Sequence, residues 1–237
     1  YREFVAIAGK CWPAFQTQFG FVPCYVNSRL TKMGIPVSCE VDIYGALSEF
    51  IGTVVSNDAV TLLDINNTVP QDIYDEDIKG KHGKYTLKDT FMGFHCGNTA
   101  SSKLSFCEMK YQMIMARSLP VEVTNGTLEG DILPGDITFF RLQSTADAKL
   151  RAYIAQGEVL PVATRSFGAI GIFAIPEMGR FYRHVLIEGN YPHHGAVAFG
   201  HFGKTLYEVF KYIGVDVSEI GYNQPAGVRY PTENPFA

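Results

Sequence analysis

The chain has 237 residues, 46% of them hydrophobic, which is enough to bury the core of one large domain or of one domain and part of another. Its formal net charge of −4, with no cluster of lysine and arginine among aromatic residues, argues against nucleic acids and anionic membranes as partners. No apolar run approaches the roughly 20 residues that a membrane-spanning helix needs.

The five cysteines are odd in number and show no Cys-x-x-Cys spacing, which argues against a disulfide framework and against a structural zinc site. We therefore expect a reducing compartment, namely a cytoplasmic location. The chain opens at Tyr1, without an initiator methionine and already inside a patterned stretch. We interpret it as a fragment of a longer protein.

The first part of the chain has the pattern of an α/β layer. Residues 23–34 indicate a helix that stops at a glycine suited to the C′ position, and residues 35–40 indicate a short apolar strand. Apolar residues at positions 47, 50, 51 and 54 have the i, i+3, i+4, i+7 spacing of one helix face. A second strand is predicted over residues 59–64.

Beyond Asp64 the pattern changes to short apolar runs separated by Gly, Pro and Asn-Gly turns, which predicts strands. Residues 66–84 read as a polar loop, residues 127–142 resemble a barrel hairpin, and residues 180–189 are grouped with the strands and turns. One helix returns at residues 201–214, where the apolar residues share a face and a glycine ends the pattern.

We therefore predict an α+β fold, with a partial α/β layer followed by a mainly antiparallel β-barrel domain with a late helix. Residues 1–58 would be the C-terminal part of an α/β domain, and residues 59–237 would be the barrel-like domain. The strand pattern beyond Asp64 carries this prediction, because short runs broken at regular intervals are typical of sandwiches and barrels.

Two carboxylates, Glu40 and Asp64, end the two predicted strands of the first part. Open α/β sheets bind ligands outside the carboxyl ends of their strands, so the two acids would converge if these strands were parallel neighbours. A carboxylate at such a place is often only a helix cap or a turn former. That alternative stays open for Asp64, while Asp42 is the better helix cap. Glu40 lies between apolar positions, where its charge needs a cation or a donor.

Three of the six histidines fall within residues 189–204, among glycines and small apolar residues. A lone histidine on an apolar face is usually a hydrogen-bonded core residue, but this density predicts a metal ligand. His194 is our choice, with His201 as an outer or structural candidate. Carboxylate oxygen and imidazole nitrogen together suit Mn²⁺, Fe²⁺ or Zn²⁺. With Glu40 and Asp64, His194 would complete a divalent-metal site.

Other residues are weaker candidates. His95 lies in a polar loop, where it could be a ligand, a substrate contact or a turn residue, and a nucleophilic Cys96 has little support. Trp12 and Gln16 combine a flat apolar ring with an amide, which suits sugar hydroxyls, although core packing of Trp12 is an equal alternative. The sequence contains neither a GxGxxG nor a P-loop pattern, so nothing in it supports nucleotide binding.

Five motifs make the chain resemble the C-terminal half of the L-fucose isomerase family, which is related in fold to L-arabinose isomerase. The motifs are CWPAFQ, IPVSCEVDIYGALS, TLLDINN, FHCGNT and PHHGAVAFGHFG. This resemblance covers most of the chain. It implies metal binding by Glu40, by Asp64, which lies 24 residues later, and by His194.

The resemblance also implies substrate contacts. His193 replaces the Asn of the family's Asn-His-Gly segment, a departure that concerns the substrate more than the metal. The segment FHCGNTASS is similar to a substrate-contacting loop, which implies roles for His95, Asn98 and Ser101, and a substrate Gln of the family is implied at Gln16. The resemblance implies a hexamer whose sites include residues of a neighbouring subunit's N-terminal domain, and we expect that domain to lie outside this fragment.

These observations predict a metal-dependent aldose–ketose isomerase, an intramolecular oxidoreductase that acts on a free sugar through a cis-enediol with Mn²⁺ or another divalent transition metal. Glu40 and Asp64 would exchange the proton between C1 and C2 as base and acid. The resemblance implies a site at a domain junction and a homo-oligomer, a hexamer or a trimer, in the full-length protein. The alternatives are a non-catalytic sugar-binding or assembly fragment and a metal-dependent hydrolase or aldolase.

Overall fold

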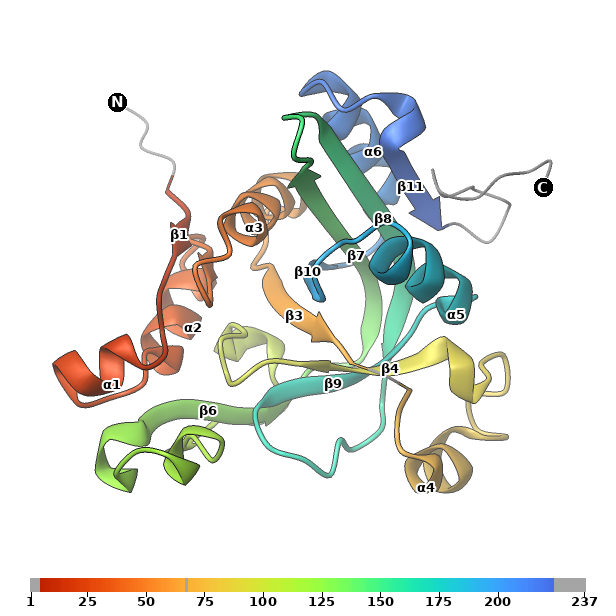
Figure 1. Ribbon diagram of the computed structural model, residues 1–237. Coiled ribbons are helices and arrows are strands. Elements are labelled where there is room, and N and C mark those ends of the chain that lie inside the picture. Colours follow the sequence, from red (N-terminus) through yellow and green to blue (C-terminus); the bar gives the residue numbers. More distant parts are fainter. Residues whose placement is uncertain (1–4, 67, 224–237) are drawn as a thin grey trace.

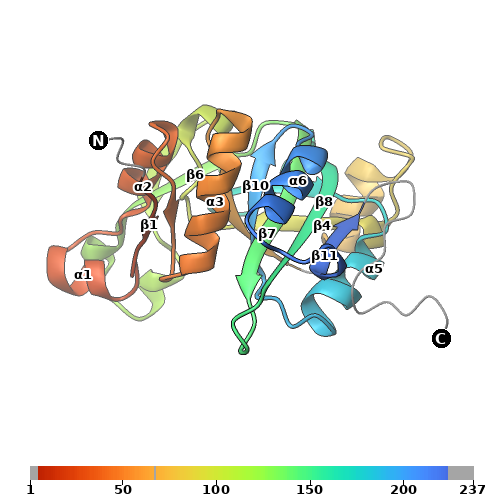
Figure 2. The same cartoon turned by 90° about the horizontal axis from the view of Figure 1, so that it is seen from above.

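The computed structural model describes residues 5–66 and 68–223, which form a small helical layer beside a large sheet (Figure 1). In the layer, β1 (Ile7–Ala8) pairs in parallel with β2 (Val37–Ser38). Its helices are α1 (Ala14–Phe19), α2 (Cys24–Lys32) and α3 (Ile43–Ser56). Figure 2 shows, as Figure 1 does, that α3 lies between the rest of the layer and the sheet, and α3 contacts β7 and β10.

Within the described residues, nine strands form the large sheet, and most neighbouring strands are antiparallel. In spatial order they are β11 (Ile220–Asn223), β8 (Leu150–Leu160), β7 (Gly135–Ser144), β10 (His194–Phe199), β3 (Thr61–Ile65), β4 (Thr90–Phe94), β9 (Ala169–Ala174), β6 (Asn125–Asp131) and β5 (Glu108–Tyr111). Only β11–β8 and β6–β9 are parallel among these pairs. This arrangement confirms the α+β class and the mainly antiparallel sheet.

An additional pairing joins β8 to β9 near their ends. This is the kind of contact that a barrel requires, and the barrel itself stays a prediction. The predicted boundary between residues 58 and 59 also stays a prediction, and residues 224–237 of the second predicted unit lie outside the described residues.

The remaining helices are short apart from the late one. They are α4 (Gln71–Ile73), η1 (Tyr74–Ile78), η2 (Leu87–Asp89), η3 (Ser101–Lys103), η4 (Met115–Arg117), η5 (Val121–Thr124), α5 (Met178–Phe181), η6 (Tyr182–Ile187), α6 (Gly203–Tyr212) and η7 (Val217–Glu219). In the part of the chain that the structure describes, no helix combines the length and the apolar character needed to cross a bilayer.

The three helices predicted from the sequence are confirmed as α2, α3 and α6. The buried face of α3, however, differs from the predicted apolar stripe, because Leu47 and Val54 are exposed. The buried positions of α3 are instead four small residues and one glutamate, namely Gly45, Ala46, Ser48, Gly52 and Glu49. A Cβ atom at Gly52 would lie 2.5 Å from the Phe140 ring, so the close approach of α3 to β7 depends on this glycine.

Two segments predicted without helix are helical. Residues 66–84 contain α4 and η1, because Ile73 and Ile78 are buried in an apolar cluster under the polar surface of this segment. Residues 180–189 continue α5 into η6, and Phe181 and Val185, four residues apart, are buried in the main core. In both segments the helical spacing of the buried residues outweighs the strand-like or loop-like composition.

Two predicted strand arrangements are wrong. Residues 127–142 do not form a hairpin, because β6 pairs with β5 and β9 whereas β7 pairs with β8 and β10. The strands that precede Glu40 and contain Asp64 are not parallel neighbours either, since β2 belongs to the small sheet and β3 lies between β10 and β4 in the large one. The two acids therefore come from different sheets.

Candidate metal centre

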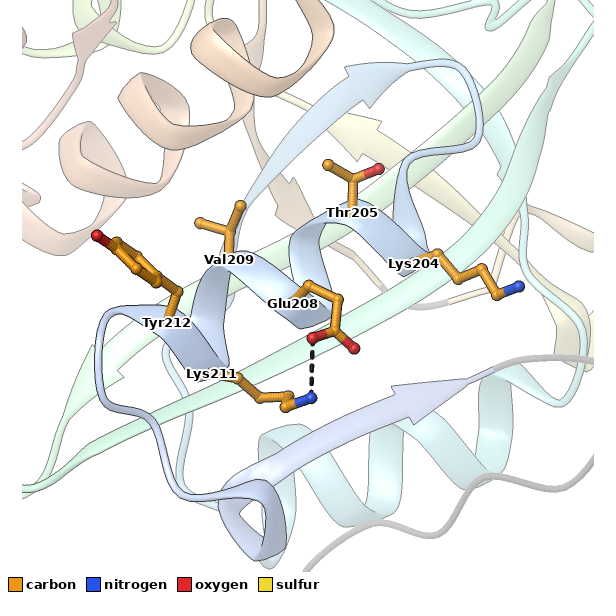
Figure 3. Close-up of a pocket in the computed structure, with 6 residues that line it drawn as sticks. All are labelled: Lys204, Thr205, Glu208, Val209, Lys211 and Tyr212. Carbon is orange, nitrogen blue, oxygen red and sulfur yellow. Dashed lines mark hydrogen bonds and ion pairs between the residues drawn. The ribbon is translucent and has the colours of Figure 1, made fainter.

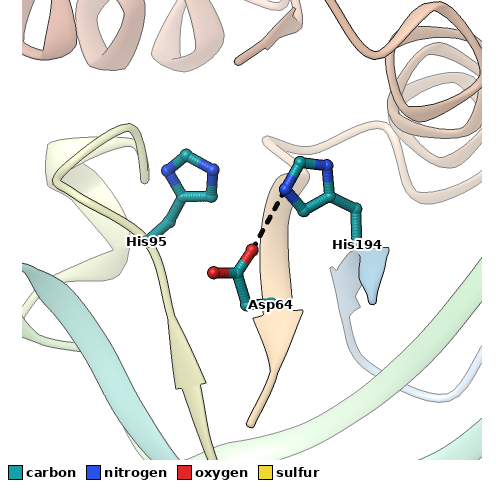
Figure 4. A group of neighbouring side chains, drawn as sticks. All are labelled: Asp64, His95 and His194. Atoms are coloured by element: carbon teal, nitrogen blue, oxygen red, sulfur yellow. Dashed lines mark ion pairs between the residues drawn. The ribbon is translucent and has the colours of Figure 1, made fainter. Parts of the chain in front are cut away.

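Three adjacent strands bring Asp64, His194 and His95 to one end of the large sheet. His194 on β10 pairs directly with Asp64 on β3, and Asp64 pairs with Phe94, the residue before His95. One potential ligand atom from each of the three side chains lies within 4.8 Å of the other two. Figure 4 shows the three side chains pointing toward a common space. This cluster is the candidate metal centre.

Asp64 and His194 each direct a buried atom into this space. Oδ1 of Asp64 and Nε2 of His194 form an ion-pair contact at 3.1 Å, and neither atom has a hydrogen-bond partner beyond this contact among the described residues. Buried polar atoms are normally paired. A cation bound to both atoms would satisfy them, and a carboxylate with an imidazole is a donor set that divalent transition metals accept. The residues present therefore fit a metal.

The other nitrogen of His194 is held by Asp42. Nδ1 of His194 lies 3.0 Å from Oδ2 of Asp42, whose carboxylate also accepts the Gly45 N–H at 2.8 Å and so caps α3. The cap confirms the role predicted for Asp42. The contact with His194 was not predicted from the sequence, although the two-residue spacing between Glu40 and Asp42 was visible there.

Arg141 on β7 holds Asp42 and His194 in place. Its guanidinium donates to both Asp42 carboxylate oxygens at 2.7 Å and to the His194 carbonyl oxygen at 3.1 Å. Only 3% of the Arg141 side chain is exposed, so the two-bonded ion pair is shielded from water. Such an arginine–carboxylate fork fixes orientation as well as charge. Sequence reasoning missed Arg141, since an arginine within a strand has no local signature.

Backbone packing also fixes the place of His194. A Cβ atom at Gly195 would lie 2.2 Å from the Phe139 ring and 2.6 Å from the Tyr153 hydroxyl. β10 therefore lies directly against the aromatic core at this position, and only glycine fits after the histidine.

The charges around His194 set its pKa. Burial alone would lower the pKa of His194, but the carboxylates of Asp42 and Asp64 outweigh burial and raise it to about 9. Burial would raise the pKa of Asp42, whereas its bonds with His194 and Arg141 hold it well below its usual range. The pKa of Asp64 is also lowered, because His194 and the other histidines outweigh the effect of its burial. Without a metal, His194 is therefore protonated at neutral pH.

Glu40 approaches the same histidine from the small layer. Its Oε2 lies 3.6 Å from His194 Nε2, and its side chain is 55% exposed. The backbone at Glu40 and Val41 has positive φ angles of 61° and 59°. Left-handed conformations of non-glycine residues are costly and gather at functional sites. This turn brings Glu40 and Asp42 to opposite nitrogens of one imidazole ring.

Three of the proposed substrate residues lie on the segments that carry the centre or on the loop that follows β4. His193 is close to the centre, with Nε2 3.6 Å from Asp64 Oδ1, and Asn98 is buried and donates to the Val37 carbonyl oxygen. Ser101 begins η3 farther along the same loop. Their roles stay predictions.

Trp12 and Gln16 lie in the small layer, at and just before α1. The views of Figures 1 and 2 agree that α1 lies far from β3 and β10. Gln16 is buried, and its amide nitrogen can donate to the carbonyl oxygens of Cys11 and Pro13, whereas Trp12 is 51% exposed. The structure does not bring these two residues to the metal centre.

Two surface hollows differ in their relation to this centre. An open groove beside it is lined by Asp42, Arg141 and Tyr191, among others, and lies next to the His194 contacts. The hollow in Figure 3 lies on the outer face of α6, where Glu208 pairs with Lys211 at 2.8 Å. It contains none of the residues discussed above.

His201 also lies away from the centre, with Nε2 3.7 Å from Asp136 Oδ1.

Curated relatives share the name sulfoquinovose isomerase. The protein from Priestia megaterium is 24% identical over 218 residues, which are 91% of this chain and 44% of that protein. The protein from Alkalicoccus urumqiensis is 26% identical over 235 residues, which cover 92% and 46%. A third, from a Clostridium species, is 28% identical over 162 residues. The chain thus spans less than half the length of these relatives.

A family model described as "L-fucose isomerase, C-terminal domain" matches residues 93–221. These residues are more than half of the chain and include His95, Arg141 and His194. The resemblance inferred from the motifs is therefore confirmed. The chain belongs to the L-fucose isomerase C-terminal domain family.

Proposed function

We propose that this chain contributes the metal centre of an aldose–ketose isomerase that works through a cis-enediol. The observation that carries the proposal is that two buried atoms, Asp64 Oδ1 and His194 Nε2, face each other at 3.1 Å and have no hydrogen-bond partner beyond this contact among the described residues. Family membership and relatives named for sugar isomerisation support the reaction class. We propose Mn²⁺ as the first metal to test and a homo-oligomer as the form of the full-length protein.

Glu40, Asp64 and His194 would hold the cation. It would act as a Lewis acid toward the carbonyl and hydroxyl oxygens at C1 and C2 of the sugar. Asp42 keeps a proton on Nδ1 of His194, which leaves Nε2 free to face the centre. Arg141 holds Asp42 in place through two hydrogen bonds.

Glu40 and Asp64 would carry the proton transfer. A base removes the proton from C2 of the aldose while O1 gains a proton, which gives the cis-enediol. The carbon proton, or one from solvent, is then returned to C1 while the hydroxyl on C2 loses its proton, which gives the ketose. Glu40 is the more exposed of the two carboxylates, so a sugar that enters from solvent can reach it first. The free sugar is the proposed substrate class, and sulfoquinovose is the first candidate because the relatives carry its name.

The experiment uses the full-length protein, loaded with Mn²⁺ and supplied with sulfoquinovose or L-fucose. A substrate with deuterium at C2 should lose part of its label to solvent, because the proton passes through a carboxylate. Glu40→Gln should lower kcat by at least about 10²-fold, the scale of a lost general base. Complete transfer of the label to C1 would instead indicate a hydride shift, and the absence of turnover for every aldose tested would exclude the function.

A second candidate is a sugar-binding or assembly unit without turnover. It is favoured by the observation that the chain spans less than half of its curated relatives. Isothermal titration with the same sugars distinguishes the two candidates. Sugar binding without ketose formation, by full-length protein that holds its metal, would support the second one.

A further inference from the structure

His95 is close enough to be a third ligand in the same cluster. Its side chain is buried, with 2% of the residue exposed, and one of its potential ligand atoms lies within 4.8 Å of those of Asp64 and His194. The centroids of the two imidazole rings are 5.7 Å apart. Distance alone therefore does not separate a ligand from a neighbour.

A hydrogen bond from the backbone decides which of the two His95 is. Nδ1 of His95 accepts the N–H of Cys96 at 3.0 Å, so Nδ1 presents its lone pair to this donor. A neutral imidazole carries one ring hydrogen, which must then be on Nε2, and a protonated ring has a hydrogen on Nε2 as well. Figure 4 shows one ring nitrogen of His95 facing the common space and the other facing away. The nitrogen that faces the centre is therefore a donor and has no lone pair for a metal.

His194 has the opposite arrangement. Its Nδ1 faces Oδ2 of Asp42 at 3.0 Å. Both oxygens of this carboxylate already accept hydrogen bonds from Arg141 at 2.7 Å, and Oδ1 also accepts the Gly45 N–H, so Asp42 is the acceptor in this contact as well. Nδ1 of His194 must therefore carry the hydrogen of this contact. In the neutral ring, Nε2 then keeps its lone pair, the form in which histidine binds metals when a carboxylate holds its other nitrogen.

We propose that the two buried histidines have opposite tautomers and opposite tasks: His194 binds the metal through Nε2, and His95 donates its Nε2–H to the sugar oxygen on C1 or C2. This inference rests on the proposed isomerase function. Oxygens bound near Asp64 and His194 come within reach of His95, because the three side chains share one space. A fixed donor aimed at an oxygen that gains negative charge stabilises the transition state.

Variants of the full-length protein separate the two tasks. In a titration with Mn²⁺ alone, His95→Leu should keep its metal stoichiometry and change the dissociation constant by less than about threefold, whereas loss of a ligand or its support costs about 10- to 100-fold or more. His194→Gln, the matched control, should lose the metal. With the sugar that the wild type converts, His95→Leu should lower kcat by about 10²- to 10³-fold. His95→Gln restores an N–H donor and should recover part of kcat.

Two results would overturn the proposal. Loss of Mn²⁺ from His95→Leu or His95→Gln, to the extent seen for His194→Gln, would make His95 a ligand. Retained metal with kcat and KM unchanged in a folded His95→Leu would exclude a substrate contact. If His95→Leu does not fold, as judged by its thermal unfolding, His95→Gln and the spectroscopic measurement below decide between the outcomes.

Nitrogen-15 NMR of the wild-type protein with diamagnetic Zn²⁺ reads the tautomers directly. The expected spectrum has the ring hydrogen of His95 on Nε2 and that of His194 on Nδ1. A hydrogen on Nδ1 of His95 would contradict the proposal. Neither this measurement nor the Mn²⁺ titration depends on turnover, so an inactive wild type would refute the proposed function and leave the tautomer assignment to be judged separately.

Discussion

Asp42 and His194, 152 positions apart in the chain, are joined by a 3.0 Å contact between Oδ2 and Nδ1. One residue begins α3 and the other begins β10, so the contact ties the small layer to the large sheet. Arg141 on β7 adds two bonds to Asp42 and one to the His194 backbone. The orientation of the candidate ligand is therefore set by three separate elements.

Asp42→Asn should weaken Mn²⁺ binding by about 10- to 100-fold, the usual effect of losing the carboxylate behind a ligating histidine. The amide keeps the side-chain size, and Asn caps a helix as well as Asp does, so the fold should persist. Titration with Mn²⁺, combined with thermal unfolding, checks both expectations. Asp136→Asn, at an exposed carboxylate beside His201, is the control. Unchanged affinity in the folded Asp42→Asn protein would exclude this role for Asp42.

Metal binding should release a proton at neutral pH. The pKa of His194 is raised to about 9, because the carboxylates of Asp42 and Asp64 outweigh its burial, so below that pH a metal must displace the proton. Apparent affinity should rise from about pH 6.5 to about pH 9 and then level off. In the metal-free protein, the stabilisation from this proton is complete below about pH 6.5, the ordinary value, and is lost as the pH rises through about 9.

Calorimetry in two buffers with different ionisation enthalpies measures the proton count. The expected value at pH 7.5 is close to one proton per Mn²⁺ from His194. An affinity that is independent of pH over this range would contradict the assignment of His194 as the ligand.

His193→Asn should change the preference among sugars while the protein keeps its metal. His193 is 59% exposed and lies 3.6 Å from Asp64 through Nε2, at the place where the resemblance implies a substrate-contacting Asn. The measurement is kcat/KM on a panel of aldoses, with bound Mn²⁺ quantified in parallel. Loss of metal from His193→Asn but not from His194→Gln would show that the ligand was assigned to the wrong histidine.

Glu49→Gln should stabilise the protein at neutral and higher pH. Glu49 on α3 is buried, and neither carboxylate oxygen has a hydrogen-bond partner among the described residues. Burial raises the pKa of Glu49 well above its usual value, and Asp42 adds to the rise. The proton on Glu49 therefore contributes stability that is fully present below about pH 4.5 and is lost as the pH rises toward the raised pKa.

Thermal unfolding between pH 4.5 and pH 8 checks this prediction. The difference in Tm between Glu49→Gln and the wild type should be small at the acidic end and should grow with pH. Glu208→Gln, at an exposed carboxylate on the outer face of α6 (Figure 3), should show no such trend. A constant difference in Tm for Glu49→Gln would mean that Glu49 does not titrate with a raised pKa.

Local patterns predicted part of this fold and missed the rest for physical reasons. The ends of α2 and α6 were predicted correctly from Gly34 and Gly214, which lie just beyond them with positive φ angles. Such helix ends depend only on residues nearby in the chain. The partners of β6 and β7 could not be deduced, since pairing across a sheet depends on residues far apart in the chain. The helix of η6 was missed because its composition is rich in aromatic and β-branched residues, and burial of Val185 decided its conformation.

The site was predictable where the motif itself carries the chemistry. Asp64, His194 and Glu40 stand out by residue type and sequence context, and the structure places the two carboxylates beside Nε2 of the His194 ring. Arg141 and the tautomer of His95 depend on contacts between β7, α3 and a loop that no sequence spacing encodes. The packing of the turn at Glu40, with its positive φ angle, was likewise invisible in the sequence.

Anomalous scattering at the manganese edge, from crystals of the full-length protein saturated with Mn²⁺, tests the metal centre most directly. The expected result is one peak at about 2.0 to 2.3 Å, the range of metal bonds to such ligands, from a carboxylate oxygen of Asp64 and of Glu40 and from Nε2 of His194. A saturated protein whose manganese peak lies elsewhere, with Asp64 and His194 bonded only to protein groups, would contradict the assignment.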